Sequence, residues 1–122
     1  MVEWSLQTVF YDPRAVTENL VDEVYQLAKK QGAGRAWRSW QRNEIGWEGL
    51  RTNFVDSLPT LAVPTLILHG AEDKYVPVSW ARRANALIRD SELHVFPRCG
   101  HWLTLEMPGE FNRVVLGFLA RK

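Results

Sequence analysis

The chain has 122 residues, 46% hydrophobic and 24% charged, a composition typical of one globular domain. Its 15 basic and 14 acidic side chains leave a formal net charge of +1, which argues against nucleic acid or an anionic membrane as a partner. The single cysteine, Cys99, excludes an internal disulfide and any multi-cysteine metal site. Because there is also no long apolar run and no secretory signal at the start, we expect a cytoplasmic protein.

Residues 1–58 show helical patterns and no convincing strand. A short amphipathic helix is predicted around residues 6–10, and Asp12-Pro13 predicts the cap and first position of a helical turn. Thr17 is a suitable N-cap for a second helix. The apolar side chains of that helix recur with a period of 3.6 residues: Leu20, Val21, Val24, Leu27 and Ala28.

A third helix, residues 35 to about 43, is predicted to combine basic and aromatic side chains. Its tryptophans are Trp37 and Trp40. The basic residues of this stretch are Lys29, Lys30, Arg35, Arg38 and Arg42. Such a stretch could bind an acid or a nucleic acid. A solvated helix face with its tryptophans turned to the core is the commoner arrangement, and it is the one we expect.

The second half of the chain predicts two buried parallel strands. The continuous apolar run at residues 65–68 is typical of a strand covered on both faces, and residues 93–96 predict another. Two strands are not a finished sheet, because their edges carry unpaired backbone groups. We therefore expect a homodimer, formed through the exposed edge of the first strand or through the helical first half.

Two helices accompany these strands. Ser79 is predicted to cap a helix over residues 80–89, between the two strands. A final helix is predicted to start at Pro108. Its apolar residues give the cleanest helical pattern in the chain: Phe111, Val114, Val115, Phe118 and Leu119.

Asp73 and His101 follow the two predicted strands, where the carboxyl ends of neighbouring parallel strands meet. A carboxylate can orient one imidazole nitrogen while the other acts as general base for a nucleophile. Taken singly, each residue is more often an ordinary turn or loop residue. Together, in the order acid then histidine, they predict the acid and base of a nucleophile–His–acid triad. A Gly-x-Ser-x-Gly nucleophile motif does not occur in the 122 residues.

Several segments resemble one enzyme family. Leu-His-Val-Phe-Pro-Arg-Cys-Gly-His-Trp at residues 93–102 and Glu-Phe-Asn-Arg at residues 110–113 are similar to the C-terminus of the meta-cleavage product hydrolases. Phe-Tyr-Asp at residues 10–12, followed by Thr17, resembles their lid. These enzymes are α/β-hydrolases that cut C–C bonds in ring-fission products. Residues 63–122 resemble the C-terminal third of that fold.

The resemblance implies a partial α/β-hydrolase fold, with a short parallel sheet, flanking helices and a helical lid. Residues 1–58 would form the lid, and residues 59–122 the C-terminal βαβα part of the core. Asp73 would be the triad acid and His101 the base. The residues expected to bind substrate are Trp102, beside the base, together with Trp37, Trp40, Trp47 and Val76. No cofactor is expected, and the complete enzyme would act on a small molecule.

The sequence departs from the subgroup in its lid. Where these enzymes usually carry arginine followed by tryptophan, this chain has Val24 and Tyr25. An arginine there would engage a substrate carboxylate, so an ester or another carbon–heteroatom bond is as good a candidate as a C–C bond. We therefore predict a fragment of a serine-type hydrolase of ester or C–C bonds, inactive alone because it lacks the nucleophile. The alternative is a stand-alone, non-catalytic interaction or dimerisation protein derived from the fold.

Other nucleophile and metal chemistries are weaker hypotheses. Cys99 lies two positions before His101, so cysteine–histidine chemistry is conceivable, although a free cysteine is usually a small buried hydrophobe. His69 is expected to be structural, and His94 to lie on a strand face or edge. The three histidines lack the spacing of metal ligands.

Overall fold

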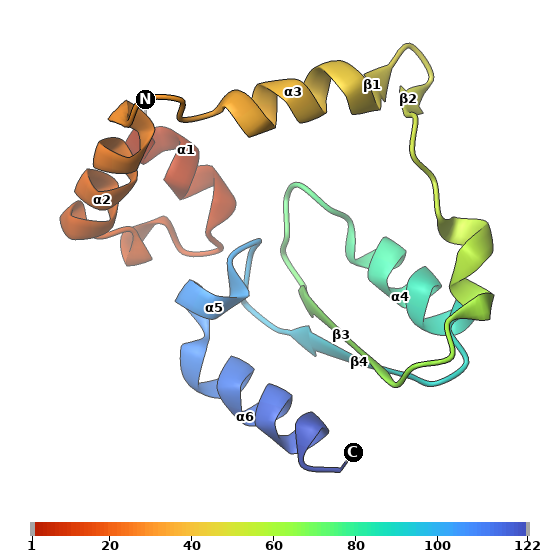
Figure 1. The fold of residues 1–122 in the computed structure, drawn as a ribbon. Coiled ribbons are helices and arrows are strands. Elements are labelled where there is room, and N and C mark those ends of the chain that lie inside the picture. Colours follow the sequence, from red (N-terminus) through yellow and green to blue (C-terminus); the bar gives the residue numbers. More distant parts are fainter. Residues whose placement is uncertain (1, 122) are drawn as a thin grey trace.

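A two-stranded parallel sheet, β3 (Thr65–Gly70) and β4 (Ser91–Phe96), lies at the centre of the second half of the chain (Figure 1). The computed structural model describes residues 2–121. Residue 65 pairs with residue 91 and residue 70 with residue 96, so both strands end at the same edge. The two predicted strands are confirmed, although β4 begins earlier than its apolar run, at Ser91.

Helices flank both faces of this sheet. Helix α4 (Val78–Leu87) packs against both strands, and α6 (Pro108–Leu119) lies on the other side of them in Figure 1. The short helix α5 (Leu103–Glu106) precedes α6. The expected short parallel sheet with flanking helices is therefore confirmed.

The predicted cap of α4 is wrong. The helix begins at Val78, before Ser79, and no side chain caps it. Its N-cap is Pro77, with φ −61° and ψ 132°. The proline ring already holds φ near the value used at a helix start, so the helix begins directly after it.

The first half begins with a pair of packed helices, α1 (Val2–Val9) and α2 (Glu18–Lys29). Between them, residues 13–15 form a 3₁₀ turn whose cap, Asp12, accepts a hydrogen bond from the backbone N–H of residue 14 at 3.0 Å. The Thr17 hydroxyl oxygen accepts one from the N–H of residue 20 at 3.3 Å and caps α2. Both predicted caps are confirmed.

Helix α3 (Arg35–Glu44) leads into an antiparallel hairpin of two-residue strands, β1 (Ile45–Gly46) and β2 (Gly49–Leu50). The hairpin corrects the expectation that the first half has no strand. Gly49 has φ +109°, which a glycine adopts without strain and which allows this tight turn. A 3₁₀ segment (Val55–Thr60) then leads to β3.

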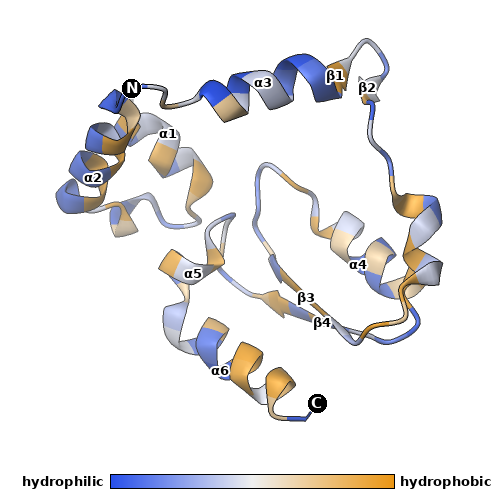
Figure 2. Ribbon diagram, viewed as in Figure 1, coloured by the Kyte–Doolittle hydropathy of each residue, from blue (hydrophilic) through white to orange (hydrophobic). Residues whose placement is uncertain are grey.

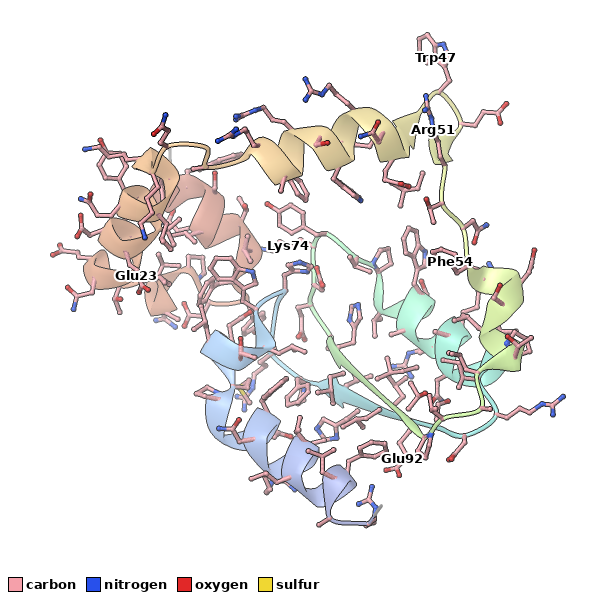
Figure 3. All side chains as sticks on the ribbon, in the orientation of Figure 1. Glu23, Trp47, Arg51, Phe54, Lys74 and Glu92 are labelled. Atoms are coloured by element: carbon pink, nitrogen blue, oxygen red, sulfur yellow. The ribbon has the colours of Figure 1, made fainter. Side chains whose placement is uncertain are left out.

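The tryptophans of α3 are not turned to a core, contrary to expectation. Trp37 is 60% exposed and Trp40 41% exposed, and their rings stack on each other with centroids 4.8 Å apart. Figure 2 shows α3 as largely hydrophilic. Trp47, labelled in Figure 3, points into solvent from the hairpin turn. Among the described elements α3 has its main contacts with the adjoining β1, so no apolar surface is at hand to cover these rings.

The buried apolar side chains come from α1 and the residue after it, from α4 and the residue after it, and from the end of β4 and its following loop. They are Leu6, Phe10, Ala81, Ile88, Phe96 and Cys99. Many other large apolar side chains stay exposed, including Phe54 and Leu116. No helix within residues 2–121 is both long and apolar enough to cross a membrane.

Candidate active site

The site begins with one hydrogen bond between the ends of the two strands. His101 Nδ1 lies 2.8 Å from Asp73 Oδ2. The Asp73 side chain is 5% exposed, whereas that of His101 is 40% exposed. An ionised carboxylate can only accept, so Nδ1–H donates, and Nε2 is left to act as a base. The predicted proximity of these two side chains is thus confirmed.

Backbone groups hold the acid in place. Asp73 Oδ1 accepts hydrogen bonds from the N–H groups of Tyr75 at 2.8 Å and Val76 at 3.0 Å. These bonds occupy one oxygen and leave Oδ2 for His101, and His69 Nε2 lies 3.9 Å from the same Oδ2. Burial raises the pKa of Asp73, but the hydrogen bonds from His101, Val76 and Tyr75 outweigh it and hold that pKa below its ordinary value. The carboxylate is therefore ionised at neutral pH, as an orienting group must be.

Gly70 allows the two strand ends to meet. A Cβ on Gly70 would lie 2.0 Å from the Gly100 carbonyl oxygen and 2.5 Å from that of Cys99. Only glycine permits this close backbone approach. Glu72 adds two bonds across the same junction, because its N–H donates to the Cys99 carbonyl oxygen and its carboxylate accepts from the Cys99 N–H, each at 3.1 Å.

The alternative roles of the other histidines and of Cys99 find no support. His69 donates from Nδ1 to the Gly70 carbonyl oxygen at 2.8 Å, and His94 Nε2 bonds to Glu110 at 3.0 Å. Cys99 is fully buried. Burial and the nearby acidic side chains, Glu106 foremost, raise its pKa to about 12, which disfavours the reactive thiolate. Within residues 2–121 no group of three or more potential ligands could hold a metal ion.

The residues predicted to bind substrate do not all gather at this pair. Trp102 packs edge-to-face on Phe10, with centroids 5.8 Å apart, and lines an apolar cavity of about 380 Å³. The cavity is lined by Val2, Ser5, Leu6, Val9, Val24 and Trp102. Val76 lies beside the acid through its N–H. Trp37 and Trp40 lie on α3 and Trp47 lies in the hairpin turn, and none of the three lines the cavity that contains Trp102.

Several contacts around His101 were not predicted. The His101 N–H donates to the Val9 carbonyl oxygen at 2.9 Å. The Tyr75 ring lies 5.6 Å from the imidazole, and its hydroxyl bonds to Thr8 at 2.8 Å. Glu106 accepts bonds from backbone N–H groups on both sides of the histidine. None of these residues belongs to a recognisable motif, so the sequence offered no signal for them.

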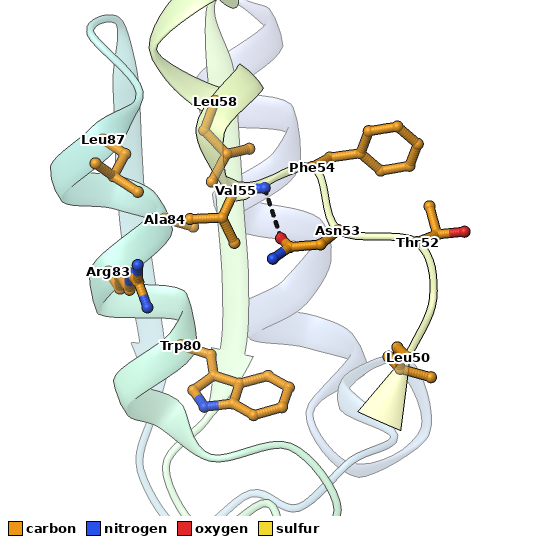
Figure 4. Close-up of a pocket in the computed structure, with 10 residues that line it drawn as sticks. All are labelled: Leu50, Thr52, Asn53, Phe54, Val55, Leu58, Trp80, Arg83, Ala84 and Leu87. Carbon is orange, nitrogen blue, oxygen red and sulfur yellow. Dashed lines mark hydrogen bonds between the residues drawn. The ribbon is translucent and has the colours of Figure 1, made fainter. Parts of the chain in front are cut away.

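A larger cavity of about 520 Å³ lies between residues 50–58 and α4 (Figure 4). Phe54, Trp80 and Arg83 are among its lining residues. Neither Asp73 nor His101 lines it. The hydrogen-bonded pair therefore lies outside this cavity.

The Asp73 contacts predict a stability contribution that depends on pH. Since folding lowers the pKa of Asp73 below 3.8, this contribution is fully present above the unfolded-state value and is lost as the pH falls through the folded-state value. We expect Asp73→Asn to lower the free energy of unfolding near neutral pH. The difference in this free energy between the variant and the unchanged chain should shrink below roughly pH 4. Urea unfolding across this range measures both. A difference that stays constant with pH would contradict a lowered pKa of Asp73 in the folded state.

Comparisons with known proteins find related hydrolases. Residues 2–114 match the model of the alpha/beta hydrolase family. The 2-hydroxy-6-oxononadienedioate/2-hydroxy-6-oxononatrienedioate hydrolase of Pseudomonas sp. is 47% identical over 118 residues, which cover 95% of this chain and 40% of that protein. The 2-hydroxy-6-oxo-2,4-heptadienoate hydrolase of Pseudomonas putida is 35% identical over 117 residues, covering 90% and 40%.

Solved structures give the same result. A variant of the meta-cleavage product hydrolase CumD from Pseudomonas fluorescens IP01 superposes with a TM-score of 0.83 at 32% identity, over 98% of this chain and 44% of that one. The serine hydrolase CarC, involved in carbazole degradation, gives 0.87 at 27% identity, over 98% and 46%. The chain spans about 40% of the length of the relatives it matches, which fits a C-terminal portion of them. The chain belongs to the alpha/beta hydrolase family and is similar to its meta-cleavage product hydrolases.

Proposed function

We propose that this chain supplies the acid and the base of a serine-type hydrolase, with Asp73 orienting His101. The observation that carries the proposal is the 2.8 Å hydrogen bond between the buried carboxylate and the half-exposed imidazole. His101 Nε2 would take the proton of a serine hydroxyl as that oxygen attacks the substrate. Asp73 would stabilise the resulting imidazolium. His101 would then donate the proton to the leaving group.

The nucleophile would come from the part of the hydrolase that precedes these residues in the relatives. The chain has no Gly-x-Ser-x-Gly motif, so we expect it to show no significant turnover by itself. Residues 1–58 would serve as the lid, because their first helices contact the histidine loop through Val9 and Trp102.

The substrate is proposed to be a small molecule that places an apolar group beside the base. Trp102 follows His101 directly, and the cavity that it lines is apolar apart from Ser5. Val24, at the place where related lids usually carry arginine, lines the same cavity. A carboxylate buried there would lack a cationic partner among the lining residues. This favours an ester, or a ring-fission product whose carboxylate binds elsewhere.

A chimera tests this function. The chain would replace the matching C-terminal part of the Pseudomonas sp. hydrolase, to which it is 47% identical. We expect the chimera to hydrolyse a p-nitrophenyl ester of a short fatty acid or a ring-fission product of that enzyme, and the chain alone to hydrolyse neither. A folded chimera that hydrolyses neither substrate class would contradict the proposal.

We also propose that the isolated chain forms a homodimer through the open edge of β3. Within residues 2–121, β3 pairs with β4 only. The Thr65 N–H points towards β4, because it donates a hydrogen bond to the Asp90 carbonyl oxygen at 2.9 Å. Because N–H groups alternate along a strand, those of Leu66 and Leu68 point to the open edge. An apolar strand with such an edge favours pairing with a second copy.

Leu66→Pro is expected to convert this dimer to a folded monomer. Proline removes an N–H that bonds to no other strand within residues 2–121, so the fold should tolerate it while edge pairing is blocked. Leu66→Val keeps the N–H and is the matched control. Sedimentation equilibrium measures the mass. A folded monomer of the unchanged chain at high micromolar concentration would contradict the proposal, and a dimer that survives Leu66→Pro would point to exchange of the helical first half.

A further inference from the structure

Glu106 gathers three backbone N–H groups on one carboxylate. Its Oε1 accepts from Gly100 at 3.0 Å and from Trp102 at 3.2 Å. Its Oε2 accepts from Gly100 at 3.0 Å and from Tyr11 at 2.7 Å. The side chain is partly buried. Hydrogen bonds to an ionised acceptor are roughly twice as strong as those between neutral groups, so these contacts form a firm anchor.

The anchor surrounds His101. The residues before and after the histidine donate to Glu106, and the histidine's own N–H donates to the Val9 carbonyl oxygen at 2.9 Å. Three consecutive N–H groups are therefore fixed by partners outside the loop. The backbone at Gly100 is tightly packed, because a Cβ there would lie 2.5 Å from the Val9 carbonyl oxygen and 3.0 Å from Glu106 Oε1.

The same carboxylate joins the histidine loop to the first half of the chain. Tyr11 follows α1 and donates to Glu106 over a separation of 95 residues. Phe10, its neighbour, is buried against Trp102. One side chain at the end of α5 thus fastens the end of α1 to the loop that carries the base.

We propose that Glu106 is a positioning residue: it holds the backbone of residues 100–102 so that His101 Nδ1 faces Asp73, and it docks residues 9–11 on that loop. The proposal rests on the proposed function of His101 as a base. Glu106 itself does not touch the Asp73–His101 hydrogen bond and acts only through the backbone. An imidazole needs such support because its ring orientation follows from where its own backbone is held.

Two variants separate the contact of Glu106 with the histidine loop from its contact with Tyr11. Glu106→Ala removes every acceptor, so the amides of Gly100, Trp102 and Tyr11 should all exchange about tenfold faster or more. Glu106→Gln keeps one carbonyl oxygen, which can still accept from residues 100 and 102 as Oε1 does. Its NH₂ group cannot accept, so the Tyr11 amide alone should lose protection.

The measurement is amide hydrogen exchange by NMR on the isolated chain, together with the Nδ1–H resonance of His101. We expect that resonance to be visible in the unchanged chain and in Glu106→Gln, and to broaden beyond detection in Glu106→Ala. A role in stability alone would instead speed exchange throughout, including at Ala71, whose N–H donates to the Phe96 carbonyl oxygen. Glu48→Gln, on the exposed hairpin turn, is the charge-matched control.

The proposal is overturned if Glu106→Ala leaves the His101 resonance and the three amides unchanged, or if these amides are unprotected in the unchanged chain. Should Glu106→Ala fail to fold, the unchanged chain and Glu106→Gln still decide the matter. Catalytic failure of the chimera with intact protection and an intact Nδ1–H signal would reject the proposed function and leave the positioning of His101 standing.

Discussion

His101→Ala in the chimeric hydrolase is expected to lower kcat by roughly 10⁴-fold or more, with KM changed only a few-fold. The variant removes the general base that takes the serine proton, and alanine offers no substitute. Substrate binding would be little affected, because His101 is not among the residues that line the cavity containing Trp102. Steady-state kinetics at saturating and low substrate separate the two constants.

Asp73→Asn is expected to cost somewhat less, roughly 10³- to 10⁴-fold in kcat. An asparagine can still accept the N–H groups of Tyr75 and Val76, but it removes the charge that stabilises the His101 imidazolium. The double variant should be hardly worse than His101→Ala, since the two residues act as a unit. His94→Gln is the control, because His94 bonds to Glu110 and not to the acid. If the chimera keeps its activity with His101→Ala, His101 is not the general base.

The strands and the acid–histidine pair were predictable because their signals are local. An apolar run followed by Gly70 or Gly100 marks a buried strand end, and the residues next to those glycines meet wherever the strands are parallel neighbours. The N-caps Asp12 and Thr17 were predictable for the same reason, since a cap depends on two or three adjacent positions.

The supports of the histidine were not predictable from single residues. Glu106 bonds to Tyr11 across 95 positions and Tyr75 to Thr8 across 67, and no periodicity links such pairs. The tryptophans of α3 were misjudged for a related reason. Their helical spacing matches a core-facing side chain, but burial depends on a neighbouring surface, and the described elements place none against α3.

Gly70→Ala is expected to destabilise the chain by about 3 kcal/mol or more, while Gly117→Ala stabilises it by roughly 0.5–1 kcal/mol. The two changes add the same methyl group. At residue 70 it would lie 2.0 Å from the Gly100 carbonyl oxygen and 2.5 Å from that of Cys99. These are backbone atoms, so a side-chain rotation cannot relieve the overlap, and the two strand ends must separate. At residue 117, inside α6, no atom of residues 2–121 lies within 4 Å of the added Cβ apart from the helix's own backbone, and alanine is the better helix former.

Separation of the strand ends would also break the Asp73–His101 bond, which gives the pair of variants a second readout. Urea unfolding gives the change in stability, and the Nδ1–H resonance of His101 reports on the bond. We expect Gly70→Ala to lose both stability and the resonance, and Gly117→Ala to keep the resonance while its unfolding midpoint rises. If Gly70→Ala unfolds at the midpoint of the unchanged chain and keeps the resonance, the close crossing of the two loops is not what holds the acid against the base.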